Sequence, residues 1–100
     1  MTKSEREQRE GALELSNSIC PVCKGSIYQY GTPQFAHKLA NTETNRKKYG
    51  TFFMNSRLIG VYTCSLGCNH LVQINNNPRE ILKLLADIVM DEIRQFENEN

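Results

Sequence analysis

The four cysteines of this chain form two close pairs, and thiolates are typical ligands of zinc. Cys20 and Cys23 enclose two residues, whereas Cys64 and Cys68 enclose three. Such short spacings let both sulfurs of a pair point at one ion from a single tight turn. The sequence therefore predicts one tetrahedral structural Zn²⁺ site. A shell with His70 in place of one thiolate is an alternative, which four cysteines make unnecessary.

Two other uses of the cysteines compete with zinc. Disulfides would need an oxidising compartment, and the hydrophilic start of the chain, MTKSEREQRE, does not look like a signal peptide. A redox dithiol is the other alternative, because residues 20–23 look locally like the motif of a glutaredoxin. That motif should open a helix, but Lys24-Gly25-Ser26 is typical of a turn. Zinc is therefore the preferred interpretation.

The composition makes a structural metal valuable, because the apolar core must be small. The chain has 100 residues, enough for one domain, and only 39% of them are apolar, with no tryptophan. A bound metal adds the folding free energy that such a core lacks. No stretch approaches the roughly 20 apolar residues that span a bilayer, so we expect no membrane partner and a cytoplasmic location.

The elements that must position the cysteines predict an α+β fold in three parts. Residues 1–18 are a charged N-terminal tail or a frayed helix. Residues 19–78 form the four-cysteine domain, and residues 79–97 form a C-terminal amphipathic helix that packs on it or forms an interface. Both cysteine pairs fall in the middle part, which must therefore fold around the metal.

Within the middle part, short strands should alternate with turns and one basic helix. Extended segments are expected at 27–30, 35–39, 51–54 and 58–63. The last two are interpreted as a hairpin that turns at 55–57, so that the second strand delivers Cys64 to the metal. The helix should begin at a cap on Asn41 or Thr42 and end at Gly50.

The clearest helix starts near Pro78 and should run to about Phe96. Its apolar side chains recur at helical spacing and form a broad stripe: Ile81, Leu82, Leu84, Leu85, Ile88, Val89, Ile93 and Phe96. The stripe has two interpretations. It covers the zinc-bound core, or part of residues 79–96 is the surface of a homodimer or of a protein partner.

A CPxCxG knuckle, a hairpin-rich middle and a second cysteine pair that leads into a helix are the layout of a treble-clef zinc site. The segments 35–42, 45–50 and 64–69 resemble small phage-type members of the HNH nuclease superfamily, over roughly residues 19–80. The resemblance implies a zinc-braced ββα-metal finger, phage origin and location in a bacterial host cell. It also implies a histidine that acts as general base beside a second divalent ion, Mg²⁺ or Mn²⁺.

This motif carries over only in part. His37 matches the first histidine, the catalytic base, although Ala36 replaces the acid that often precedes it. The family's Asn and an earlier His fall on Ile59 and Ser56. Phosphodiester hydrolysis needs an activated water and positive charge on the developing oxyanion, and lost metal ligands remove the second requirement. Whether the chain is an enzyme, an HNH-type DNA endonuclease, stays open with a leaning against it.

The last histidine of the motif corresponds to Asn69, with His70 one place later. If either side chain turned toward His37, a divalent ion could bind there. The plainer interpretation makes His37 a buried histidine bonded to backbone, and His70 an exposed residue or a partner of a zinc ligand.

A basic segment between the cysteine pairs favours a nucleic-acid partner, although the net charge is only +1. Its candidate DNA contacts are Lys38, Arg46, Lys47, Lys48, Tyr49 and Arg57. Two hypotheses follow. The chain is an HNH-like protein that binds DNA and retains metal-dependent nicking, or it is a catalytically dead scaffold that acts as a protein-binding inhibitor or adaptor.

Overall fold

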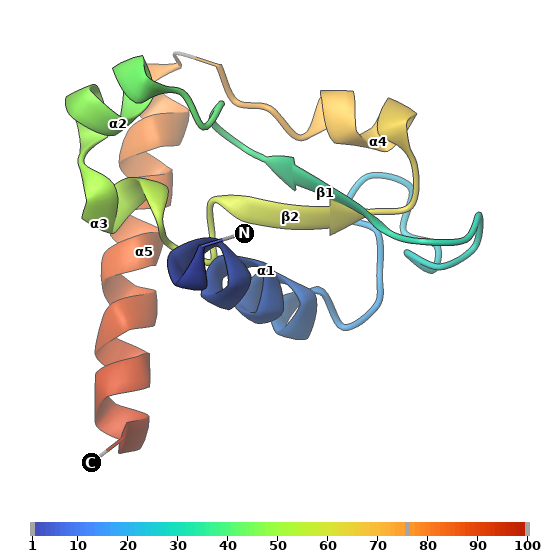
Figure 1. Cartoon of the computed structure of the whole chain (residues 1–100), viewed down its shortest axis with the longest axis horizontal. Coiled ribbons are helices and arrows are strands. Elements are labelled where there is room, and N and C mark those ends of the chain that lie inside the picture. Colours follow the sequence, from blue (N-terminus) through green and yellow to red (C-terminus); the bar gives the residue numbers. More distant parts are fainter. Residues whose placement is uncertain (1, 76, 100) are drawn as a thin grey trace.

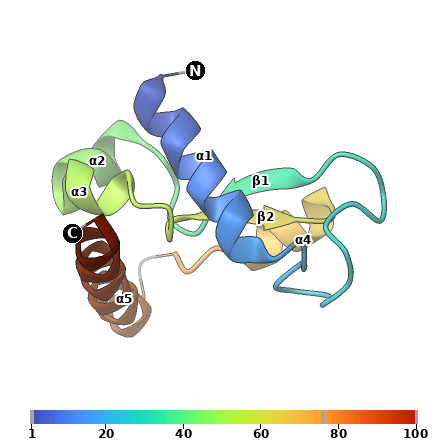
Figure 2. The same cartoon turned by 90° about the horizontal axis from the view of Figure 1, so that it is seen from below.

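The computed structural model describes residues 2–75 and 77–99 and confirms a mixed α+β fold (Figure 1). In chain order the elements are α1 (Lys3–Ser16), β1 (Gln34–His37), α2 (Glu43–Tyr49), α3 (Thr51–Met54), β2 (Gly60–Thr63), α4 (Leu66–Leu71) and α5 (Pro78–Glu99). Helices α1 and α4 lie on opposite faces of the strand pair, and α5 stands beside α2 and α3 (Figure 1, Figure 2).

β1 and β2 form an antiparallel pair in which Gln34 lies opposite Thr63 and His37 lies opposite Gly60. A glycine suits the last position, because a Cβ there would lie 2.6 Å from Cζ of Phe35. The extended segments predicted at 35–39 and 58–63 are thus confirmed in part, but they pair with each other.

The predicted strand at 51–54 and its hairpin are wrong, because these residues form α3. Phe53 and Met54 are neighbours, and both are buried, with 3% and 0% of their surface exposed. A strand would send adjacent side chains to opposite faces, whereas a helical turn lets both enter one core. The amide of Met54 accordingly donates to the carbonyl of Gly50 at 3.1 Å.

The strand predicted at 27–30 is also wrong, because this segment forms consecutive turns. The amide of Gln29 donates to the carbonyl of Ser26 at 3.3 Å, and that of Gly31 donates to Tyr28 at 3.1 Å. Ile27 is fully buried at the centre of the turns. The period-two pattern of the sequence therefore reflects one anchored side chain rather than a paired strand.

The predicted basic helix is confirmed as α2. The hydroxyl of Thr42 caps it by accepting a hydrogen bond from the amide of Asn45 at 3.1 Å. Gly50 ends it with φ of 87°, a left-handed conformation that glycine adopts at low cost. The last turn carries the cations Arg46, Lys47 and Lys48, which suit the negative end of the helix dipole.

The N-terminal segment is a packed helix rather than a tail. Gln8 is buried, and its side-chain amide donates to the carbonyls of Met54 and Ser56 at 3.0 and 2.9 Å. Gly11 leaves room for Arg57, because a Cβ there would lie 2.7 Å from Cβ of that arginine. These contacts fasten α1 to the segment that leads into β2.

α5 begins at Pro78, as predicted, and continues to Glu99. Its buried side chains join one core cluster, made of Leu39, Phe53, Met54, Ile59, Leu84 and Ile88. A second, smaller cluster surrounds the cysteines and consists of Cys20, Ile27 and Cys64. Neither α5 nor any other helix in the described part of the chain is long and apolar enough to cross a membrane.

Candidate metal centre

The first cysteine pair lies in a tight turn between α1 and β1. The amide of Cys20 donates to the carbonyl of Gly25 at 2.8 Å, and the amide of Lys24 donates to the carbonyl of Cys20 at 2.9 Å. Lys24 closes the turn with φ of 68°. Ile19 and Ser26 pair across its base as an isolated bridge. These backbone contacts define the turn that carries the first two thiols.

The second pair sits where β2 passes into α4. Cys64 follows the strand directly, as predicted, and Cys68 lies in the first turns of the helix. Ser65 caps α4, because its hydroxyl accepts a hydrogen bond from the amide of Cys68 at 3.2 Å. A strand end and a capped helix start therefore hold these two sulfurs.

The four thiols meet, with all their sulfurs within 4.8 Å of one another. Sγ of Cys64 lies 3.4 Å from Sγ of Cys23 and 3.8 Å from Sγ of Cys68. A tetrahedral zinc with bonds of about 2.3 Å separates its sulfurs by about 3.8 Å, whereas a disulfide bond is about 2.05 Å long. Cys20, Cys23, Cys64 and Cys68 could therefore hold a metal ion such as zinc.

Hydrogen bonds within the cluster shift the pKa values of its thiols in opposite directions. At Cys20 burial raises the pKa of the thiol, but backbone hydrogen bonds at Cys23, Cys64 and Val22 outweigh burial and lower this pKa to about 6. At Cys64 burial and the neighbouring sulfurs raise the pKa to about 12. The side chain of Gln29 donates to Sγ of Cys23 at 3.3 Å. Four thiolates would need a metal cation to neutralise their charge.

A second group of polar side chains surrounds a cavity of about 300 Å³ beside β1 and α4. His37 lines it from the end of β1, Asn69 and His70 line it from α4, and Asn41 lines it from the loop before α2. The oxygen of the Asn69 side chain accepts a hydrogen bond from the hydroxyl of Thr63. The fold thus brings together three positions that the sequence singled out separately.

His37 is half-buried in a cationic environment. Burial lowers the pKa of its imidazole below the usual 6.5, the charges of Arg9 and Arg46 lower it further, and Glu5 opposes them. The ring of Phe35 packs edge-on against His37 with centroids 5.0 Å apart, and Arg9 lies over that phenylalanine. At pH 7 the imidazole is therefore neutral and can donate or accept one hydrogen bond.

The positions at which the resemblance expects further metal ligands lie in the core. Ile59 is completely buried among apolar side chains. Ser56 is 6% exposed, and its hydroxyl accepts a hydrogen bond from the amide of Leu58 at 3.1 Å. Neither residue is among those that line the cavity of His37. Both positions serve packing and turn formation here.

α2 carries the exposed part of the basic segment. Lys47 pairs with Glu43 at 3.1 Å on the surface, and Lys48 lies over the ring of Tyr49 at 5.3 Å. That tyrosine packs against Phe53 of the core. Arg46, on the same helix, donates to Oδ1 of Asn41 at 2.6 Å, and Asn41 lines the cavity of His37.

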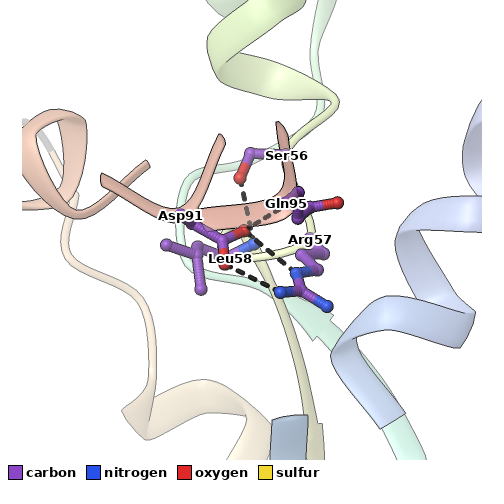
Figure 3. Close-up of polar contacts among 5 residues, drawn as sticks. All are labelled: Ser56, Arg57, Leu58, Asp91 and Gln95. Atoms are coloured by element: carbon purple, nitrogen blue, oxygen red, sulfur yellow. Dashed lines mark hydrogen bonds and ion pairs between the residues drawn. The ribbon is translucent and has the colours of Figure 1, made fainter. Parts of the chain in front are cut away.

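The remaining two basic candidates are engaged inside the molecule. Arg57 donates to both carboxylate oxygens of Asp91 at 2.9 and 2.8 Å, and Gln95 donates to the same carboxylate (Figure 3). This contact lowers the pKa of Asp91 and raises that of Arg57. Burial lowers the pKa of Lys38, with a smaller opposing effect from Asp87. The six predicted DNA contacts therefore do not form one surface.

Sequence reasoning missed the contributions of α1 and of Asp91. Arg9 acts on the imidazole of His37 from a segment that was interpreted as a tail or a frayed helix. Gly11 and Ala12 could have predicted this packing. They lie three and four residues after Gln8, so a helix would place these small residues on one side, where another segment could approach closely. Asp91 gave no such signal, because at about 100° per residue Glu92, and not Asp91, falls within the apolar stripe.

No known family model, curated protein or solved structure matched this chain.

Proposed function

We propose that this chain is a zinc-organised, HNH-like protein that binds the phosphate backbone of DNA without cutting it. The observation that carries the proposal is the cationic field at His37, a residue that lines the cavity beside α4. Arg9 and Arg46 both act on that imidazole, and His70 lines the same cavity. Such a field attracts anions. The phosphate backbone of DNA is a dense array of anionic groups that arginine and lysine side chains neutralise.

The metal in this proposal is zinc in a treble clef. A soft set of four sulfurs favours Zn²⁺ over Mg²⁺ or Ca²⁺, which prefer oxygen ligands. The knuckle at residues 20–25, the pair of β1 and β2, and the start of α4 supply the three parts of a treble clef. The ion holds α4 against the strands, so that it also shapes the cavity.

DNA contacts come from α2 and from the rim of the cavity. Lys47 and Lys48 are exposed and extend the cationic field along the surface from Arg46. Asn41 orients Arg46 through its hydrogen bond, which reduces the side-chain entropy lost on contact with a phosphate. Neutral His37 adds an N–H donor. These are contacts to the backbone, so the binding is independent of base sequence.

Binding without cleavage follows from the ligands at hand. Hydrolysis requires a divalent ion that stabilises the developing charge. Such hard ions prefer carboxylates, yet the described residues that line the cavity include no carboxylate. The two positions of the motif that would add ligands, Ser56 and Ile59, lie in the core.

Fluorescence anisotropy with a short DNA duplex tests the binding. We expect affinity to fall steeply between about 50 and 200 mM salt. The variant Lys47→Glu/Lys48→Glu should reduce the salt slope by about 2. The control Lys3→Glu/Arg94→Glu makes the same charge change at two exposed residues outside α2 and should leave the slope unaltered. Equal losses in both variants, or binding insensitive to salt, would contradict the proposal.

A plasmid assay separates binding from catalysis. Supercoiled plasmid is incubated with the protein and Mg²⁺, Mn²⁺ or Ni²⁺, beside the variant His37→Ala. We expect the plasmid to stay supercoiled with both proteins. Metal-dependent nicking that His37→Ala abolishes would replace the proposed function by that of an HNH endonuclease.

A further inference from the structure

α5 carries a row of large apolar side chains that the other described residues leave partly exposed. The row consists of Leu82, Leu85, Val89 and Ile93, with 67%, 39%, 42% and 44% of their surface exposed. Spacings of three and four residues place them on one side of the helix. The buried residues Leu84, Ile88 and Asp91 occupy another side. A contiguous exposed apolar row of this kind marks an interaction surface.

We propose that a second copy of this chain covers the row, with the two α5 helices antiparallel. The charged residues beside the row favour a second copy of this chain as the partner. Arg79 and Glu97 are 18 residues apart, which is about five turns, so they flank the same side of the row at opposite ends. An antiparallel partner brings each Arg79 next to the other copy's Glu97.

The apolar residues are self-complementary in the same arrangement. With Val89 at the two-fold axis, Leu85 of one copy packs against Ile93 of the other. Glu97 then falls opposite residue 81, between the exposed cations Arg79 and Lys83. Every contact occurs twice, as a two-fold symmetric interface requires.

A parallel pairing fits less well. It would place Glu97 of one copy near Glu92 and Glu99 of the other, because opposite flanks face each other in a parallel pair. It would also align the two helix dipoles, which repel in that orientation. The charge pattern therefore selects the antiparallel pair.

The position of α5 leaves room for a second helix. It stands at the edge of the molecule, and its C-terminal turns extend beyond the other elements (Figure 1, Figure 2). Its 22 residues span about 33 Å, or six turns. The row runs along about three of them. The other copy's α5 can therefore approach without displacing α1 or the cysteine turn.

Sedimentation equilibrium of the full chain with its metal tests the dimer. The chain has a mass of 11.5 kDa, so a dimer is twice that mass. We expect the average mass to rise from the monomer toward the dimer between about 5 and 200 µM protein. Val89→Glu should keep the protein monomeric over this range. The control Leu71→Glu changes an equally apolar, 72% exposed residue on α4 and should leave the dimer intact. Circular dichroism and zinc content verify that both variants are folded.

A charge exchange tests the orientation. Arg79→Glu and Glu97→Arg should each raise the dissociation constant of the dimer about tenfold, because each creates two like-charge contacts. The double variant should restore it to within about threefold of wild type. A monomer at the highest concentration, a dimer that tolerates Val89→Glu, or a double variant no better than the single ones would overturn the proposal.

Discussion

The two ends of the molecule are held together in different ways. The metal end, residues 19–30 and 60–71, buries Cys20, Ile27 and Cys64 and combines a segment of turns with the short elements β2 and α4. The helical end, residues 39–59 and 78–95, buries six apolar side chains from two helices and the segments beside them. Apolar burial contributes roughly in proportion to area, so the helical end has the larger intrinsic stability. The comparison teaches where an ion would matter: we expect the metal end to depend on a metal held by its four cysteines, and the helical end to depend on its apolar core.

Cys64→Ser should have the largest effect, because it removes a buried sulfur at the centre of the cluster. We expect loss of zinc and of more than about 5 kcal/mol of stability. Hydrogen exchange should show amides of the metal end losing protection before those of the helical end. Ser65→Ala, at the next residue, removes a helix cap and a hydrogen bond to Cys64 but no sulfur, and should cost about 1 kcal/mol. Equal loss of protection at both ends of Cys64→Ser would break the comparison.

Ile88→Ala reverses the test by weakening the helical end. Ile88 is fully buried in the core cluster, so the variant should lose about 3 kcal/mol and keep one zinc per chain. Chemical denaturation, together with a metal assay, measures both quantities. Met90→Ala alters a half-exposed side chain of the same helix and should cost less than about 1 kcal/mol. Loss of zinc from Ile88→Ala would mean that the two ends fold as one unit.

Asp91→Asn should have a smaller effect that depends on pH. The variant leaves Arg57 without a counter-charge and should cost about 2 kcal/mol at pH 7. Because Arg57 lowers the pKa of Asp91 in the folded state, the unfolded state binds this proton more readily. The stability from Asp91 is therefore complete above about pH 4 and is lost as pH falls through the folded pKa.

Denaturation at several pH values checks this prediction. The gap between wild type and Asp91→Asn should be constant from neutral pH to about pH 5 and should shrink below about pH 4. Asp87→Asn, an exposed aspartate on the same helix, should stay within about 0.5 kcal/mol of wild type throughout. A gap that grows on acidification would contradict the ion pair.

Elements with a strong local signal could be predicted from the sequence. Thr42 and Gly50 bracket α2, and Pro78 starts α5, because caps and prolines act through their immediate neighbours. The clustering of the four cysteines was likewise predictable, because two closely spaced pairs are the usual spacing of the ligands of one metal ion. These signals need no knowledge of the rest of the chain.

The remaining features depend on tertiary contacts that no local pattern records. The sequence around Phe53 and Met54 predicts a strand, but both side chains pack in one core, which requires a helical turn. Gln8 belongs to a charged segment, yet it binds carbonyls that lie more than forty residues away. Arg57 of the basic segment is neutralised by Asp91, which lies 34 residues further along the chain. Long-range pairing of this kind decides which charges of the basic segment remain exposed.

The most direct measurement for the central claim is X-ray absorption at the zinc edge of natively purified protein, combined with its zinc content. The four-cysteine centre predicts one zinc per chain, bound by four sulfurs at about 2.3 Å. Absence of zinc, a disulfide, or a nitrogen ligand in place of a sulfur would contradict it, and the difference between the two ends of the molecule would lose its cause.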